Sequence, residues 1–115
     1  MILLQIESAQ AVENLEQLIS VPGVDAVFIG PNDLSQTLGL PGDPTTPEVI
    51  RYVERTLEIC QRANTPCGVH TYDVAGAKQW IQKGMRFMAC GNEVTWLVDS
   101  AQRAVAEIRE AYPQK

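Results

Sequence analysis

The sequence predicts an α/β fold in which four consecutive strand–helix units build a parallel sheet. Short apolar runs rich in branched and aromatic side chains occur four times, as expected of strands buried on both faces. Each run is followed by a segment with helical spacing of its apolar residues, and Gly, Pro or capping residues separate the two. Such alternation places helices on a parallel sheet. With 115 residues, the single domain 1–115 supplies about half of a (β/α)8 TIM barrel, which requires roughly 250 residues.

The sequence leaves the assembly of this sheet open. A four-stranded open sheet has unpaired backbone groups along both edges, which is a liability. Two copies of the chain could close a barrel together, so a homodimer or a higher homo-oligomer is expected. Alternatively, the chain could form a flavodoxin-like open sheet.

The first unit consists of a strand over residues 2–6 and a helix that Ser8 caps. The apolar residues of this helix recur at helical spacing and are Val12, Leu15 and Ile19. The Val-Pro-Gly sequence at residues 21–23 ends the helix.

The second strand, over residues 24–29, ends in an unusual way. Gly30 allows a sharp turn, and Pro31 has no amide to donate to a ladder. Asp33 therefore lies just past the carboxyl end of a strand, where α/β folds place ligands. The connection that runs on to Thr46 is expected to be a functional loop, because connections of that length are usually functional or disordered.

The second helix begins with Thr46 as its cap and Pro47 at its first position, where a missing amide costs nothing. Its apolar stripe is formed by Ile50, Val53, Leu57 and Cys60. The third strand is expected over residues 67–70.

The last two helices follow the same rules. Asp73 caps a helix that ends at Gly84. The residues expected on its inner face are Val74, Ala77 and Ile81. The fourth strand covers residues 87–90, and the last helix runs from about residue 93 to 112. Its expected inward-facing residues are Leu97, Ala101, Val105, Ile108 and Tyr112.

Composition excludes several classes of function. Hydrophobic residues make up 45% of the chain and charged residues 20%, as in an ordinary globular protein. The net charge of -5 argues against nucleic acid or an anionic membrane as a partner. No apolar run approaches the roughly 20 residues of a membrane span, and residues 1–4 are too short for a signal peptide. Three scattered cysteines fit a reducing cytoplasm, so a cytoplasmic location is expected.

A set of motifs resembles the HpcH/HpaI aldolase family, which is related to the citrate lyase β-subunit. The motifs are Leu4-Gln5-Ile6-Glu7, Gly23-Val24-Asp25, Phe28-Ile29-Gly30-Pro31-Asn32-Asp33-Leu34-Ser35, Gly39, Gly42 and Pro47-Glu48-Val49. The resemblance covers the whole chain, but only the carboxyl half of the family's barrel, from about its fifth strand to its eighth helix. It implies a metal-dependent class II aldolase that acts on pyruvate-derived 2-oxo acids.

The resemblance also implies a set of site residues. Glu7 and Asp33 match the family's metal ligands, and Gln5 matches a catalytic, substrate-binding residue that reaches the bound oxo acid. The backbone around Asn32 and Asp33 would help to hold the substrate carboxylate. Two carboxylates at the ends of adjacent strands, about 4.8 Å apart, could share one Mg²⁺ or Mn²⁺ and leave positions open for water and substrate.

Each candidate also has a purely structural explanation. Asp33 could be a turn or capping residue, Glu7 a solvated residue in a first helical turn, and Gln5 part of a polar layer of the sheet. His70 lies on the same rim and is either a general base or a residue bonded to a nearby carbonyl. The cysteines and tryptophans are expected to pack as hydrophobic residues, and these are Cys60, Cys67, Cys90, Trp80 and Trp96.

The resemblance implies that two of the family's active-site residues have no match in this chain. The family's active-site histidine and the arginine that binds the pyruvate carboxylate come from the first half of the barrel, which this chain does not match. Aldolase activity of the isolated chain is therefore expected to be weak or nil. Leu4, Ile6 and Phe28 are expected to fill a barrel interior and to drive self-association when exposed. The alternative function is a non-catalytic, self-associating half-barrel that retains relic site residues.

Overall fold

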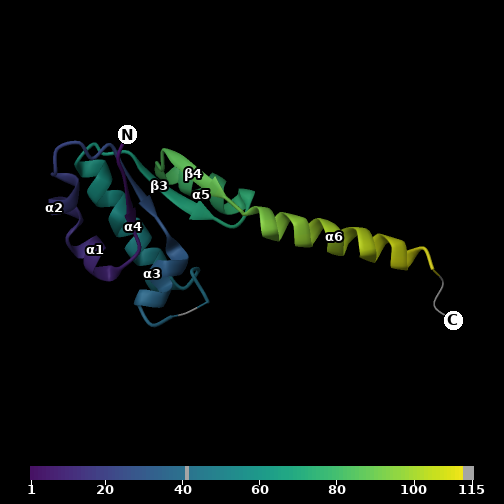
Figure 1. Ribbon diagram of the computed structural model, residues 1–115. Coiled ribbons are helices and arrows are strands. Elements are labelled where there is room, and N and C mark those ends of the chain that lie inside the picture. Colours follow the sequence, from purple (N-terminus) through teal and green to yellow (C-terminus); the bar gives the residue numbers. More distant parts are fainter. Residues whose placement is uncertain (41, 113–115) are drawn as a thin grey trace.

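The computed structural model describes residues 1–40 and 42–112. Its four strands form one parallel sheet, in the order β1 (Leu3–Ile6), β2 (Ala26–Ile29), β3 (Cys67–Thr71) and β4 (Phe87–Cys90) (Figure 1). A flavodoxin-like sheet would place the second strand at the edge, before the first. The sequential order is that of a barrel segment, so the fold is the half-barrel and not the flavodoxin-like alternative.

The helices begin largely where the sequence predicts. They are α1 (Ala9–Glu13), α2 (Leu15–Ile19), α3 (Pro31–Thr37), α4 (Pro47–Arg62), α5 (Val74–Lys83) and α6 (Glu93–Glu110). The side chains of Ser8, Thr46, Asp73 and Asn92 each accept a backbone hydrogen bond at the start of a helix. The single helix expected after Ser8 is divided at Asn14 into α1 and α2. None of the helices in the described ranges is long and apolar enough to cross a membrane.

The expected loop after Pro31 is wrong over its first part, because residues 31–37 form α3. Pro31 ends the strand, as predicted, but its fixed φ also suits the first position of a helix. Leu34 and Ser35 of this helix are buried. Asp33 therefore lies in the first turn of a helix rather than in an open loop.

The core lies between one face of the sheet and the helices α1 to α5. Ile6, Ile29 and Val69 lie in register across the first three strands and are no more than 1% exposed. The expectation that Leu4 and Ile6 fill a barrel interior is wrong, because side chains alternate along a strand and Ile6 faces the helices. Leu4 is half-buried.

The opposite face of the sheet carries the next register row, which consists of Gln5, Phe28, Gly68 and Phe87. Phe28 and Phe87 stack across Gly68 with their ring centroids 5.4 Å apart. A Cβ on Gly68 would come within 2.6 Å of the Phe87 ring, so the absence of a side chain permits this stack. This row would point into the interior of a closed barrel, as predicted for Phe28.

Two expected helix faces are not covered. In α5 the buried residues are Ala77 and Trp80, whereas Val74 and Ile81 are exposed. In α6 no residue is buried, and every residue over 93–112 that the sequence predicts to face inward is exposed. Figure 1 shows α6 extending away from the body, which gives the chain a length of 66 Å against 29 and 22 Å across.

Candidate functional site

Two carboxylates meet at the carboxyl ends of β1 and β2. Glu7 directly follows β1, and Asp33 lies in the first turn of α3, which follows β2. Gly30 lies between them: a Cβ placed on Gly30 would be 3.0 Å from Glu7 Oε1 and 3.4 Å from Asp33 Oδ2. The two oxygens are therefore no farther apart than the sum of these distances. The structure brings together the two residues that the sequence predicts to share a cation.

Neighbouring hydrogen bonds hold this pair in place. The Gly30 amide donates to the Ile6 carbonyl over 3.2 Å, which extends the β1–β2 pairing to the site. The Thr37 hydroxyl lies 3.1 Å from the Glu7 carbonyl oxygen and so links the end of α3 to the end of β1. The Gln5 amide donates to Glu7 Oε1 over 2.5 Å, which orients that carboxylate.

A hollow of about 200 Å³ opens beside the carboxylates, and we call it the rim hollow. It is lined by Gln5, Phe28, Gly30, Pro31, Asn32, Asp33, His70 and Ala89. It contains three of the four predicted site residues, and Gln5 connects it to the fourth, Glu7. Pockets for drug-sized ligands measure about 300–1,000 Å³, so this hollow suits a molecule of a few heavy atoms.

His70 reaches the rim hollow from β3. Its Nε2 lies 3.1 Å from the Gly91 carbonyl oxygen. Because a carbonyl only accepts, Nε2 carries the proton, and in the neutral ring Nδ1 is the unprotonated nitrogen. The structure therefore supports the explanation of His70 as a rim residue bonded to a carbonyl, although its ring also lines the hollow.

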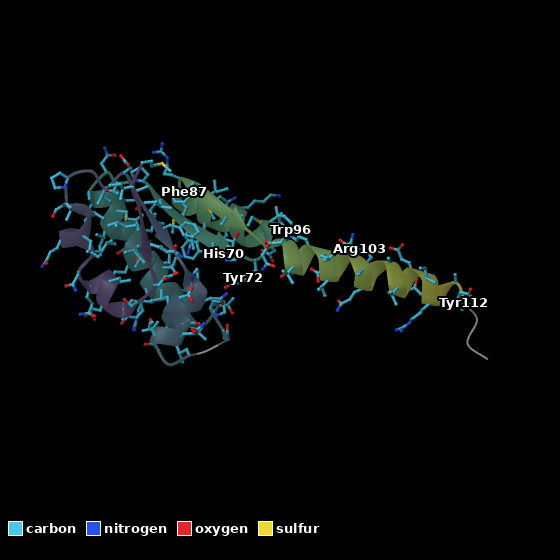
Figure 2. All side chains as sticks on the ribbon, viewed as in Figure 1. His70, Tyr72, Phe87, Trp96, Arg103 and Tyr112 are labelled. Carbon is cyan, nitrogen blue, oxygen red and sulfur yellow. The ribbon has the colours of Figure 1, made fainter. Side chains whose placement is uncertain are left out.

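Tyr72 is a neighbour that the sequence analysis missed. Burial raises the pKa of its phenol and the Asp33 carboxylate adds to this effect, while a hydrogen bond with the Asn32 side chain opposes it. Its ring meets that of His70 edge-on, with the centroids 5.3 Å apart. Figure 2 shows both rings near the point where α6 leaves the body. The available signal was its position directly after β3, on the rim where the other candidates lie.

The donors present suit a hard divalent cation. Mg²⁺ and Mn²⁺ prefer oxygen ligands, and Mg²⁺ is commonly held by one or two carboxylates while water and substrate complete its shell. Within residues 1–40 and 42–112, no group of three or more His, Cys, Asp or Glu side chains could hold a metal ion. Glu7 and Asp33 supply two carboxylates, which is the number that such a partly open oxygen site uses. Asp33 also lies at the positive end of α3, where a carboxylate stabilises the start of a helix. This structural role is compatible with a role in holding a cation.

Comparison with known sequences finds the family. The family model described as HpcH/HpaI aldolase/citrate lyase matches residues 1–100. The chain is 36% identical over 107 residues to a hydroxypyruvate/pyruvate aldolase of Paraburkholderia phytofirmans, covering 93% of this chain and 41% of the relative. It is 35% identical to a 2-keto-3-deoxy-L-rhamnonate aldolase of Klebsiella pneumoniae, covering 99% and 43%.

Solved structures agree with this result. An HpcH/HpaI aldolase from Desulfitobacterium hafniense superimposes with a TM-score of 0.91 at 31% identity, over 98% of this chain and 44% of that one. A family member from Burkholderia cenocepacia gives a TM-score of 0.87 at 34% identity, over 93% and 42%. The chain spans about two-fifths of the length of the relatives it matches. It belongs to the HpcH/HpaI aldolase/citrate lyase family.

Proposed function

We propose that this chain carries the metal-binding half of a class II aldolase, which uses a divalent cation to cleave hydroxylated 2-oxo acids by a retro-aldol reaction. The observation that carries this proposal is the convergence of Glu7 and Asp33 over Gly30, beside the rim hollow. The names of the relatives support the substrate class, since they include a hydroxypyruvate/pyruvate aldolase and 4-hydroxy-2-oxo-heptane-1,7-dioate aldolases. Pyruvate is the expected small 2-oxo acid.

The residues suit the charge that such a cleavage generates. Breaking the carbon–carbon bond beside a 2-oxo acid leaves an enolate, whose negative charge a bound Mg²⁺ or Mn²⁺ would stabilise as a Lewis acid. Glu7 and Asp33 would hold the ion, and Gln5 would keep the Glu7 carboxylate oriented and contact the oxo acid. The first amides of a helix have no partner within it, so those of Asn32 and Asp33 are available to the substrate carboxylate.

The chain lacks two parts of the family's machinery. The resemblance assigns the general base and the carboxylate-binding arginine to the first half of the barrel, and no arginine lines the rim hollow within residues 1–40 and 42–112. We therefore expect binding of a cation without efficient turnover unless a matching half completes the site. That half would be the rest of a larger enzyme or a second copy of this chain.

The uncovered surfaces of α6 and of the open sheet face favour self-association. They support a second candidate function. One side of α6 carries a stripe of exposed apolar residues, and Tyr112 follows just beyond the end of the helix; the stripe consists of Val94, Leu97, Val98, Ala101, Val105 and Ile108. The open sheet face adds Leu3 and Phe28. Burying such surface contributes about 25 cal/mol per Å², and a second copy would supply equivalent surface. The second candidate is accordingly a self-associating half-barrel without catalysis.

Calorimetric titration with Mn²⁺ tests the proposed site. Wild type should bind the ion, Asp33→Ala should weaken binding at least tenfold, or about 1.4 kcal/mol, and Asp99→Ala on the exposed α6 should bind as wild type does. Equal affinity in wild type and Asp33→Ala would remove the metal site. Exchange of the pyruvate methyl protons with solvent, followed by proton NMR, then separates the two functions. Exchange no faster than in buffer would favour the non-catalytic candidate.

A further inference from the structure

Two of the three cysteines meet at the end of the sheet opposite the rim. Cys60 lies in the last two turns of α4, and Cys67 is the first residue of β3. The connection between them turns back sharply: Asn64 has a φ of 53°, and the Thr65 amide donates to the Cys60 carbonyl over 2.9 Å. Both cysteines are buried, with exposures of 0% and 2%, and neither is in a disulfide.

The two thiols affect each other's pKa in opposite directions. A hydrogen bond from the Cys67 thiol lowers the pKa of Cys60, against the opposing effect of burial. The same hydrogen bond raises the pKa of Cys67, with burial and the Cys60 charge adding to the increase. Cys60 is therefore the thiol that ionises first, and Cys67 remains its protonated partner.

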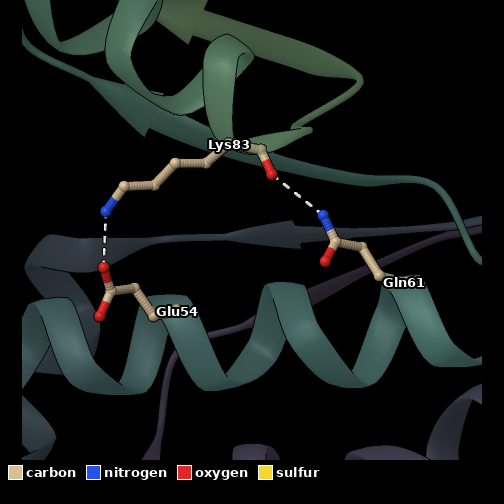
Figure 3. A network of polar contacts seen from close by, with 3 residues as sticks. All are labelled: Glu54, Gln61 and Lys83. Carbon is tan, nitrogen blue, oxygen red and sulfur yellow. Dashed lines mark hydrogen bonds and ion pairs between the residues drawn. The ribbon is translucent and has the colours of Figure 1, made fainter.

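A second hollow, of about 160 Å³, reaches this pair, and we call it the thiol hollow. Both cysteines line it, together with Gln61, Gly84 and Arg86. Figure 3 shows how one wall is fixed: the Gln61 amide donates to the Lys83 carbonyl over 3.0 Å, and Lys83 Nζ pairs with Glu54 Oε1 at 2.5 Å. A water molecule occupies about 30 Å³, so the thiol hollow has room for a small oxidant such as hydrogen peroxide.

From the hollow that both cysteines line and the sharp turn that joins α4 to β3, we propose that Cys60 and Cys67 form a redox site that a hydroperoxide oxidises to an internal disulfide. The Cys60 thiolate attacks the peroxide oxygen, giving a sulfenic acid and releasing the remaining oxygen as an alcohol or water. The Cys67 sulfur then displaces the sulfenic oxygen, which leaves as water with the Cys67 proton. Two thiols lose two electrons in total and one peroxide is reduced.

The consequence is a covalent link between α4 and β3. The bond would join the end of the helix that packs most of the core to the start of the strand that carries His70. Cys90, at the carboxyl end of β4, does not line the thiol hollow and is not part of the pair. The proposal is independent of aldolase activity, because the thiol hollow and the rim hollow share no residue.

Intact-mass and peptide analysis of the full chain test the proposal. Cleavage after Lys and Arg separates the three cysteines, which fall in the peptides 56–62, 63–78 and 87–103. After treatment of the reduced protein with hydrogen peroxide, the intact mass should fall by two hydrogen atoms, and peptides 56–62 and 63–78 should elute as one species that dithiothreitol separates. Cys90→Ser should give the same result.

The single variants identify the attacking thiol. Cys67→Ala should accumulate a sulfenic acid at Cys60 that dimedone traps, and Cys60→Ala should give little adduct at Cys67. Far-ultraviolet circular dichroism checks that both variants fold. If a variant does not fold, the peptide map of the wild-type protein still tests whether the disulfide forms. A wild-type protein whose mass is unchanged, or rises by oxygen atoms without linked peptides, would overturn the proposal. A link that requires Cys90 would do the same.

Discussion

Helices α4 and α6 follow the same local rules but differ in what covers them. Both begin with a side-chain cap, Thr46 in one and Asn92 in the other, and both carry an apolar stripe at helical spacing. In α4 the stripe packs against the core, whereas no residue of α6 is buried. Figure 2 shows Trp96 and Arg103 along α6, and Tyr112 just past its end, on the part of the chain that extends away from the body. Local sequence is thus sufficient to form a helix, but its burial requires a partner surface.

Matched leucine truncations should give the largest difference between the two helices. Leu57 of α4 is 5% exposed and Leu97 of α6 is 71% exposed. Leu57→Ala should lower the free energy of unfolding by about 2–5 kcal/mol, because it leaves a cavity in the core. Leu97→Ala should change it by less than about 0.5 kcal/mol in dilute monomer. Urea unfolding followed by circular dichroism measures both, and equal losses would show that α6 is covered within the chain.

A charge on the stripe of α6 tests whether a second copy covers it. Ile108→Asp should weaken self-association at least tenfold, or about 1.4 kcal/mol, because a carboxylate would have to enter an apolar contact. Ser100→Asp, away from the stripe, adds the same charge and should associate as wild type does. Light scattering across a dilution series gives the dissociation constants. A wild type that stays monomeric at every concentration would remove the proposed self-association.

Removing the caps should also destabilise the protein more at α4 than at α6, by less than the leucine truncations do. Thr46→Ala should cost about 1 kcal/mol of global stability, because α4 unfolds together with the core. Asn92→Ala should leave the global transition unchanged and raise amide hydrogen exchange in the first turn of α6 only. If Asn92→Ala lowers global stability as much as Thr46→Ala, the two helices are equally coupled to the core.

A methyl group added at Gly30 should disturb the metal site at the rim without disturbing the core. Gly30 has a φ of -100°, which any residue can adopt, yet a Cβ there would lie 3.0 Å from Glu7 Oε1. Gly30→Ala should therefore weaken Mn²⁺ binding several-fold with little loss of stability. Titration calorimetry and urea unfolding of the same sample make the test. Unchanged affinity would show that the carboxylates need not approach each other over this position.

The features of the fold that the sequence predicts correctly depend on patterns among residues that are close together in the chain. The four strands and the caps follow from alternation and capping chemistry, and the positions of Glu7 and Asp33, though not their role, follow from the shared edge of parallel strands. Pro31 was harder to interpret, because the same residue ends a strand and starts a helix. The predicted inner face of α5 is correct at Ala77 and wrong at Val74 and Ile81, because several apolar residues compete for one face and Trp80 takes the buried position.

Other features depend on contacts that no local pattern encodes. Tyr72 approaches Asn32 and Asp33 from a different strand, and the Cys60–Cys67 pair forms only when the chain folds back between α4 and β3. The exposure of α6 reflects a surface that the described residues do not supply. Periodicity identified the stripe of that helix but not the partner that would cover it.

A double-mutant cycle for Mn²⁺ affinity tests most directly whether Glu7 and Asp33 share one ion. Glu7→Gln and Asp33→Asn keep the side-chain shape and remove one charge each. If both oxygens hold the same cation, each single variant should lose at least tenfold in affinity, and the double variant should lose far less than the product of the two losses. Losses that multiply independently, or single variants that bind Mn²⁺ as tightly as wild type, would contradict the shared site.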